Sequence, residues 1–363
     1  MKEYGSDLND NPDVTSVAIG HRTSKRPMER RRGTRSVIRS YFLAFEGMTE
    51  CRYFEMIKDH KSELGIRSDI DIVNLSRYDQ DMGNSDNRWM LDAMKEYMHL
   101  VKTGEYSVYL FVGDLMQQLY RHMIGDPDRK RMFTDPYLNA LNKKSLVGSV
   151  NAIVGKLQKS IINDLKDTSF VSKGYVTDLY GAMEYCSNKI KGVPETTGYA
   201  PYLRLPSNKR KESFDEEWDV FCFIFDRDRR SGDRVNPKRY IRFLDNCRDA
   251  SIEPYVSNPC FEFWILMHFI ESIPSFDENK VLENKKVDCD GIERSYVECI
   301  LHRCLEYGYR KDFSTVEPLL ANDCKLIDTA MVVSKSYASD LTELESRIGT
   351  NVGNLIQRMR DNK

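Results

Sequence analysis

The sequence contains no apolar run long enough to cross a bilayer. The best run, from Phe261 to Ile270, falls well short of the roughly 20 residues that a spanning helix requires. The first 20 residues are polar and acidic, which matches neither a secretory signal nor a transit peptide. We therefore expect a soluble, cytoplasmic protein that does not engage a membrane.

A disulfide framework, a Gly-rich phosphate loop of the Walker type and an excess of one charge are also missing. The nine cysteines are an odd number and scattered, as is typical of reduced thiols. Because 54 Lys and Arg face 56 Asp and Glu, net charge alone does not drive binding to nucleic acid. Without a Walker loop, any ATPase activity requires a partner protein.

The 363 residues suffice for two domains, or for one domain with a large insertion. Residues 1–36 show no hydrophobic period, and we expect a disordered arm there. Basic residues crowd together from His21 to Arg39, and an arm of this kind either binds phosphates or stays solvated. These residues are Arg22, Lys25, Arg26, Arg30, Arg31, Arg32, Arg35 and Arg39.

Two continuous apolar runs, Tyr41 to Phe45 and Val220 to Phe225, are typical of strands buried in a parallel sheet. An amphipathic helix and a strand follow each run. The order β, α, β, insertion, β, α, β, α predicts an α/β fold with a doubly wound, mostly parallel sheet. We place this core at residues 37–76 and 218–272.

Between the two halves of the core, residues 77–217 carry mixed polar and amphipathic segments. A structureless loop of that length is improbable inside a compact domain, so we expect a mainly helical insertion. Within it, Tyr106 to Leu115 is either a strand or the start of a helix. Residues 273–363 are expected to form a helical C-terminal region.

Acidic residues follow both apolar runs. Glu46 comes directly after the first, and Asp226 and Asp228 follow the second. Ligands of open α/β sheets bind outside the carboxyl ends of the strands, and Mg²⁺ commonly takes one or two carboxylates there. Either these residues form a cation site, or each is a solvated strand end, as Asp commonly is in turns.

Two further features adjoin this candidate site. Glu262 lies one turn into a helix that starts near Pro259, where it either completes the metal site or serves as a favourable first-turn acid. The loop after Asp228 is basic, and we expect it to bind nucleic-acid phosphates. Its residues are Arg229, Arg230, Arg234, Lys238 and Arg239.

Several segments resemble a known family. The stretches FLAFEGMTE (Phe42 to Glu50) and FIFDRD (Phe223 to Asp228) resemble the Toprim (topoisomerase–primase) signature. SNPCFEFWILMH, starting at Ser257, resembles the hallmark of RloB-like proteins, a bacterial family of Toprim-like proteins found near restriction and anti-phage loci. TNVGNLI, starting at Thr350, resembles that family's C-terminal motif. The resemblance covers residues 37–75 and 219 to the C-terminus, whereas the insertion departs from it.

The resemblance implies a Toprim-like fold that holds Mg²⁺ or Mn²⁺ through Glu46, Asp226 and Asp228. It also implies a nuclease in anti-phage defence, with Glu46 as general base or second-metal ligand. We expect the substrate to be either DNA or RNA, with tRNA among the candidates, and the candidate partners to be an ATPase and further copies of this chain. The alternative is a non-catalytic Toprim-like subunit that binds nucleic acid or an ATPase and signals infection.

Overall fold

The protein is described by a computed structural model that covers residues 39–75, 87–125, 139–206, 215, 217–227, 237–269, 276–311 and 313–361. The chain divides into two units, and the described residues all belong to the second, Ile38–Lys363. The predicted arm, residues 1–36, lies outside the described residues, and of the basic cluster from His21 to Arg39 the structure describes Arg39.

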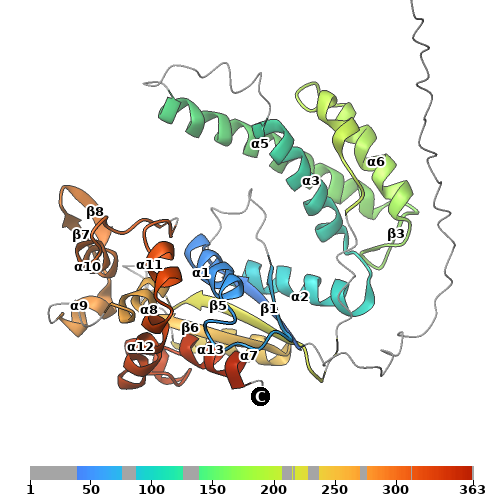
Figure 1. The fold of residues 1–363 in the computed structure, drawn as a ribbon. Helices are drawn as coiled ribbons and strands as arrows, with labels where there is room; N and C mark the ends of the chain where they lie inside the picture. Colours follow the sequence, from blue (N-terminus) through green and yellow to red (C-terminus); the bar gives the residue numbers. More distant parts are fainter. Residues whose placement is uncertain are drawn as a thin grey trace, which may run out of the picture. The chain divides into compact units, whose positions relative to one another are not determined.

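A five-stranded sheet organises the fold (Figure 1). Four of its strands run parallel, in the spatial order β2-β1-β5-β6, and β9 adds to β6 antiparallel. The bounds are Arg39–Phe45 for β1, Ile70–Leu75 for β2, Val220–Asp226 for β5, Ile252–Asn258 for β6 and Gly349–Thr350 for β9. The predicted α/β class and mostly parallel sheet are confirmed.

Helices cover both faces of this sheet. Alternate side chains of a strand point to opposite faces, so β1 contributes Leu43 to one core and Phe42 to the other. The first core includes α1 (Met48–Asp59) and α8 (Phe261–Met267), and the second includes α2 (Asn87–Thr103) and α7 (Pro237–Asp249). Burial on both faces explains why the strands read as continuous apolar runs.

The chain order reverses between β1 and β5. From β1 the chain passes through α1 to β2 on one side, and from β5 through α7 to β6 on the other. Such a reversal is the topological switch point at which open parallel sheets bind ligands, outside the carboxyl ends of the strands. Glu46 and Asp226 stand at the carboxyl ends of these two strands.

The segment between the sheet halves is mainly helical where it is described. After α2 come α3 (Val108–Gly125), α5 (Asn139–Lys166), the hairpin of β3 (Val171–Ser172) and β4 (Tyr175–Val176), α6 (Leu179–Lys191) and the 3₁₀ helix η2 (Thr197–Tyr202). The open question over Tyr106 to Leu115 is resolved in favour of a helix. Apolar residues from Leu100 to Leu203 form a buried cluster of their own. The domain boundaries at 77 and 217 stay predictions.

The C-terminal region is not purely helical, and this prediction is wrong in two places. Its helices are α9 (Glu278–Glu283), α10 (Tyr296–Cys304), α11 (Glu317–Asn322), α12 (Lys325–Val333), η4 (Ser334–Ser336), η5 (Glu343–Glu345) and α13 (Val352–Asp361). A hairpin of β7 (Lys286–Cys289) and β8 (Ile292–Ser295) interrupts them, and β9 joins the sheet. The hairpin turns at Asp290 and Gly291, both with positive φ, the Asp-Gly pair that such two-residue turns favour.

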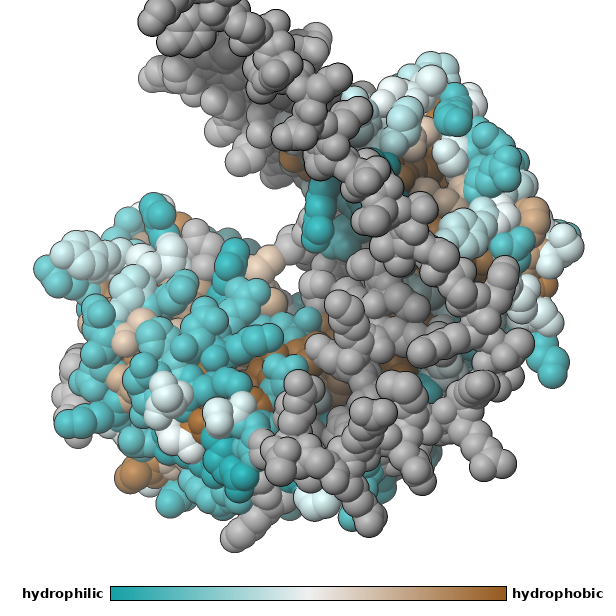
Figure 2. Space-filling model, turned by 45° about the vertical axis from the view of Figure 1, so that its right-hand side comes forward, coloured by the Kyte–Doolittle hydropathy of each residue, from teal (hydrophilic) through white to brown (hydrophobic). Residues whose placement is uncertain are grey.

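In the described part of the chain, no helix combines the length and apolar character needed to cross a membrane. On the face seen in Figure 2, the coloured surface is largely hydrophilic, with hydrophobic side chains in limited patches.

Candidate functional site

Glu46 and Asp226 meet at the switch point of the sheet. The Oε2 atom of Glu46 accepts a hydrogen bond from the backbone N–H of Asp226 at 2.9 Å. The backbone N–H of Glu46 donates to the carbonyl of Ile224 at 3.1 Å, which ties the end of β1 to β5. The structure thus brings together two of the three residues predicted from the strand ends. Asp228 lies outside the described residues.

The start of helix α8 is also held to this site, through Asp226. The Oδ1 atom of Asp226 accepts a hydrogen bond from the backbone N–H of Phe261, the first residue of α8, at 2.8 Å. One residue further on, Glu262 stands in the first turn of that helix and is only 8% exposed. A first-turn acid that merely complements the helix dipole is usually solvated, so this burial calls for a further reason.

Glu50 belongs to the same cluster, although it was not among the predicted site residues. It lies in the first turn of α1 and is 4% exposed. A side chain in a helix leans toward the helix N-terminus, here toward Gly47. A Cβ atom added at Gly47 would lie 2.6 Å from Oε2 of Glu50. The signal available in the sequence was the second glutamate of the Glu-Gly-x-Thr-Glu stretch.

The charges of these residues act on one another. The pKa of Asp226 is raised well above its usual range, first by burial of the carboxyl group and then by the negative charges of Glu50, Glu46 and Glu262. Burial and like charges both disfavour the ionised form of a carboxyl group. A buried carboxyl group whose pKa is raised by neighbouring carboxylates, at the switch point of a sheet, is typical of a functional site.

The donor chemistry of this cluster fits a hard divalent cation. Mg²⁺ binds carboxylate oxygens and commonly takes only one or two of them, with water and substrate phosphate as its other ligands. Glu46, Asp226 and Glu262 supply such oxygens. Within the described ranges, no three His, Cys, Asp or Glu side chains lie close enough together to hold a metal ion by themselves. The third predicted strand-end ligand, Asp228, is outside those ranges.

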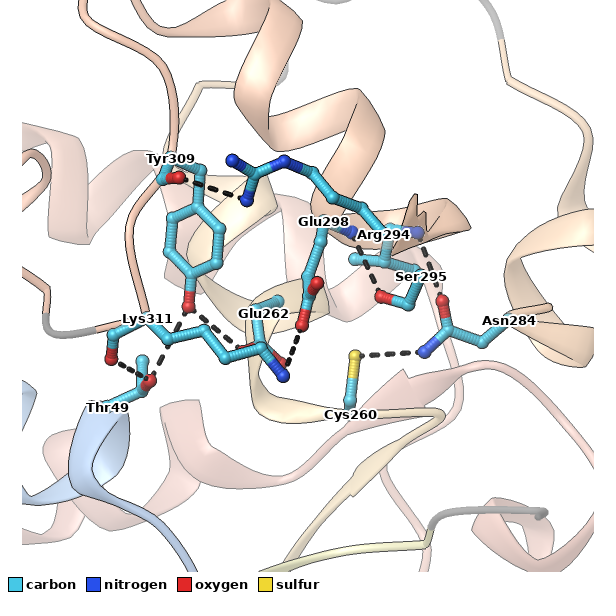
Figure 3. A network of polar contacts seen from close by, with 10 residues as sticks. Thr49, Cys260, Glu262, Asn284, Arg294, Ser295, Glu298, Tyr309 and Lys311 are labelled. Atoms are coloured by element: carbon cyan, nitrogen blue, oxygen red, sulfur yellow. Dashed lines mark hydrogen bonds and ion pairs between the residues drawn. The ribbon is translucent and has the colours of Figure 1, made fainter. Parts of the chain in front are cut away.

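A polar network connects this cluster to the C-terminal region (Figure 3). The hydroxyl of Tyr309 donates to Oε1 of Glu262 at 2.9 Å and lies 3.4 Å from Oγ1 of Thr49. Thr49 in turn donates to the backbone carbonyl of Lys311 at 2.9 Å. The Lys311 ammonium pairs with Glu298 at 2.6 Å. Burial and the charge of Glu262 raise the pKa of Tyr309, so its phenol remains a donor at neutral pH. Sequence reasoning found neither Tyr309 nor Thr49 in this role.

Of the five predicted nucleic-acid-binding residues, two can be placed. Lys238 and Arg239 are exposed in the first turn of α7, the helix that leads from β5 to β6. Arg229, Arg230 and Arg234 lie outside the described residues. A phosphate-binding role for this loop stays a prediction.

In the comparison with protein families, a family model described as RloB-like protein matches residues 136–359. This range includes Asp226, Glu262 and Tyr309. It also includes the second half of the insertion, so the expectation that the whole insertion departs from the family is wrong. Residues 37–75, which contain Glu46 and Glu50, lie outside the match. Comparison with curated proteins and with solved structures gives no match.

Proposed function

We propose that this chain, which belongs to the RloB-like protein family, is a nuclease that hydrolyses phosphodiester bonds with the help of Mg²⁺ or Mn²⁺. The observation that carries the proposal is the carboxylate cluster at the switch point, where burial and the charges of Glu50, Glu46 and Glu262 raise the pKa of Asp226. The parallel sheet, with a glutamate after β1 and Asp-x-Asp after β5, supports a Toprim-like core.

Each carboxylate of the site has a proposed role in this reaction. A bound divalent cation supplies charge stabilisation at the phosphoryl oxygen and lowers the pKa of a bound water. Asp226 and Asp228 are the proposed ligands, with Glu262 beside them. Glu46 acts as general base or as ligand of a second cation. Gly47 leaves room for the Glu50 carboxylate, which a Cβ atom at this position would meet at 2.6 Å.

The wider setting of this activity is proposed from the family. The resemblance of the sequence is to a family found near restriction and anti-phage loci, so we propose a defence role for this chain. Its substrate is DNA or RNA, with tRNA among the candidates. A partner ATPase would supply the trigger, and self-association of the chain would complete the assembly.

The test is incubation of the purified chain with tRNA, single-stranded DNA and plasmid, each with Mg²⁺, Mn²⁺ or EDTA. We expect cleavage of at least one substrate with a metal and none with EDTA. Asp226→Ala and Glu46→Ala should each abolish it, since the cluster loses a carboxylate. Asp249→Ala, which removes an exposed acid at the end of α7, is the matched control and should cleave normally.

Two results would count against a nuclease. Full cleavage by folded Asp226→Ala would remove the proposed chemistry. Binding of nucleic acid that survives EDTA, with no cleavage of any substrate, would instead favour the non-catalytic subunit that recognises nucleic acid or a partner ATPase.

A further inference from the structure

We propose that Tyr309 is a positioning residue for Glu262, through which the C-terminal region completes the carboxylate site. This inference rests on the proposed cation site but not on the identity of the substrate. Two other carboxylates of the site each have one oxygen held by a backbone N–H: Glu46 by that of Asp226, and Asp226 by that of Phe261. The hydroxyl of Tyr309 does the same for Oε1 of Glu262.

Tyr309 is held at every polar group it has. Its backbone N–H donates to Nδ1 of His302 at 2.9 Å, and its carbonyl accepts from Arg294 at 3.3 Å. The preceding residue, Gly308, has φ of +66°, and a Cβ atom there would lie 2.3 Å from the His302 ring. Glycine is therefore required for the chain to turn this close to α10. The two backbone hydrogen bonds and the glycine turn fix the backbone of Tyr309 against α10 and Arg294.

The position of the phenol also links the two helices that carry the buried glutamates. Its hydroxyl lies between Oε1 of Glu262, in the first turn of α8, and Oγ1 of Thr49, in the first turn of α1 next to Glu50. The ring is fully buried. A buried phenol needs a hydrogen-bond partner, but a core position would be served equally by a carbonyl oxygen. Pairing with a carboxylate, here at 2.9 Å, gives a directional and charge-assisted bond, which is what orientation of a ligand requires.

Positioning by Tyr309 predicts a specific effect on cation binding. Partners that orient a metal-binding carboxylate typically contribute 10–100-fold to metal affinity. Tyr309→Phe keeps the ring and removes the hydroxyl, so we expect Mn²⁺ affinity of the full chain to fall about 10-fold. The measurement is titration of Mn²⁺ by calorimetry and by the electron paramagnetic resonance of the free ion. Tyr307→Phe, at a tyrosine that is 78% exposed, is the matched control and should bind as the wild type does.

A double variant separates positioning from packing. If Tyr309 acts through Glu262, Tyr309→Phe should cost little further Mn²⁺ affinity in a Glu262→Gln background, because interacting residues are not additive. Glu262→Gln keeps an oxygen acceptor for the phenol. It serves as the test on its own if Tyr309→Phe does not fold, and should lower Mn²⁺ affinity at least as much.

Three outcomes overturn the proposal: unchanged Mn²⁺ affinity in folded Tyr309→Phe, unchanged affinity in Glu262→Gln, or additive losses in the double variant. A wild type that binds Mn²⁺ with the expected pattern of variants, yet cleaves no nucleic acid, would refute the nuclease and leave the role of Tyr309 standing. If the wild type cleaves with a metal, and Tyr309→Phe binds Mn²⁺ and cleaves as the wild type does, the nuclease stands and the role of Tyr309 is refuted.

Discussion

Replacement of Gly47 by alanine tests the geometry of the site without removing any of its charges. Gly47 has φ of −130° and ψ of 175°, an extended conformation that alanine adopts freely, so the backbone is not strained. The added Cβ atom would lie 2.6 Å from Oε2 of Glu50, whereas ordinary contact begins at 3.4 Å. The carboxylate must therefore move by about 0.8 Å, the difference between these two distances.

A displacement of this size matters for chemistry more than for stability. A misplacement of about 1 Å costs on the order of 100-fold in rate even where the substituted residue does not itself react, so we expect kcat to fall by about 10- to 100-fold. The atom that moves is the end of a side chain, so the free energy of unfolding should change by no more than about 1 kcal/mol. Steady-state cleavage and urea unfolding measure the two effects.

Two comparisons make this test specific. Gly155→Ala, in α5, meets no atom within 4 Å and should leave cleavage unchanged. In a Glu50→Ala background, Gly47→Ala should have little further effect, because the atom it displaces is gone. Wild-type cleavage by Gly47→Ala, or an undiminished effect in the Glu50→Ala background, would refute the role of Glu50 as part of the site.

Two other predictions concern buried groups whose pKa is shifted. Because the fold holds the pKa of Asp226 above that of the unfolded chain, ionisation at neutral pH opposes folding. Asp226→Asn should abolish cleavage yet raise the free energy of unfolding at pH 7. The difference in stability between the variant and the wild type should vanish below pH 3.8, where the wild-type carboxyl group is protonated in both states. A variant less stable than the wild type at pH 7 would contradict this. The buried His268 accepts from the hydroxyl of Tyr53, and burial lowers its pKa from 6.5 to about 4. The unfolded chain therefore takes up a proton first, and this one group should cost about 3 kcal/mol of stability as pH falls from 6.5 to 4. Urea unfolding across that range should show a shallower loss in His268→Gln, and parallel curves would count against the assignment.

The strand ends of the site were predictable from sequence, because burial on both faces leaves a continuous apolar run and the next residue marks its carboxyl end. Glu46 and Asp226 follow from that pattern. Whether Tyr106 to Leu115 forms a strand or a helix could not be decided from the sequence, because an apolar run of this length fits a strand and a buried helix equally. Its continuation to Gly125 as one helix comes from packing within the cluster of residues 100–203.

The rest of the site depends on contacts between residues far apart in the chain. Tyr309 lies 47 residues from Glu262 and 260 residues from Thr49, and no local pattern reports such a pairing. The β7–β8 hairpin is a different case. Its Asp290-Gly291 turn was visible in the sequence, but the flanking strands are mostly exposed and polar, so they carry no apolar alternation.

Diffraction from crystals soaked in Mn²⁺ examines the carboxylate cluster most directly. The cluster predicts an anomalous peak about 2.1 Å from a carboxylate oxygen of Asp226, with Glu46 or Glu262 as a further ligand and Oε1 of Glu262 still bound to Tyr309. A Mn²⁺ ion found at another place in the chain, with Asp226 unliganded, would contradict the assignment of this sheet edge as the metal centre.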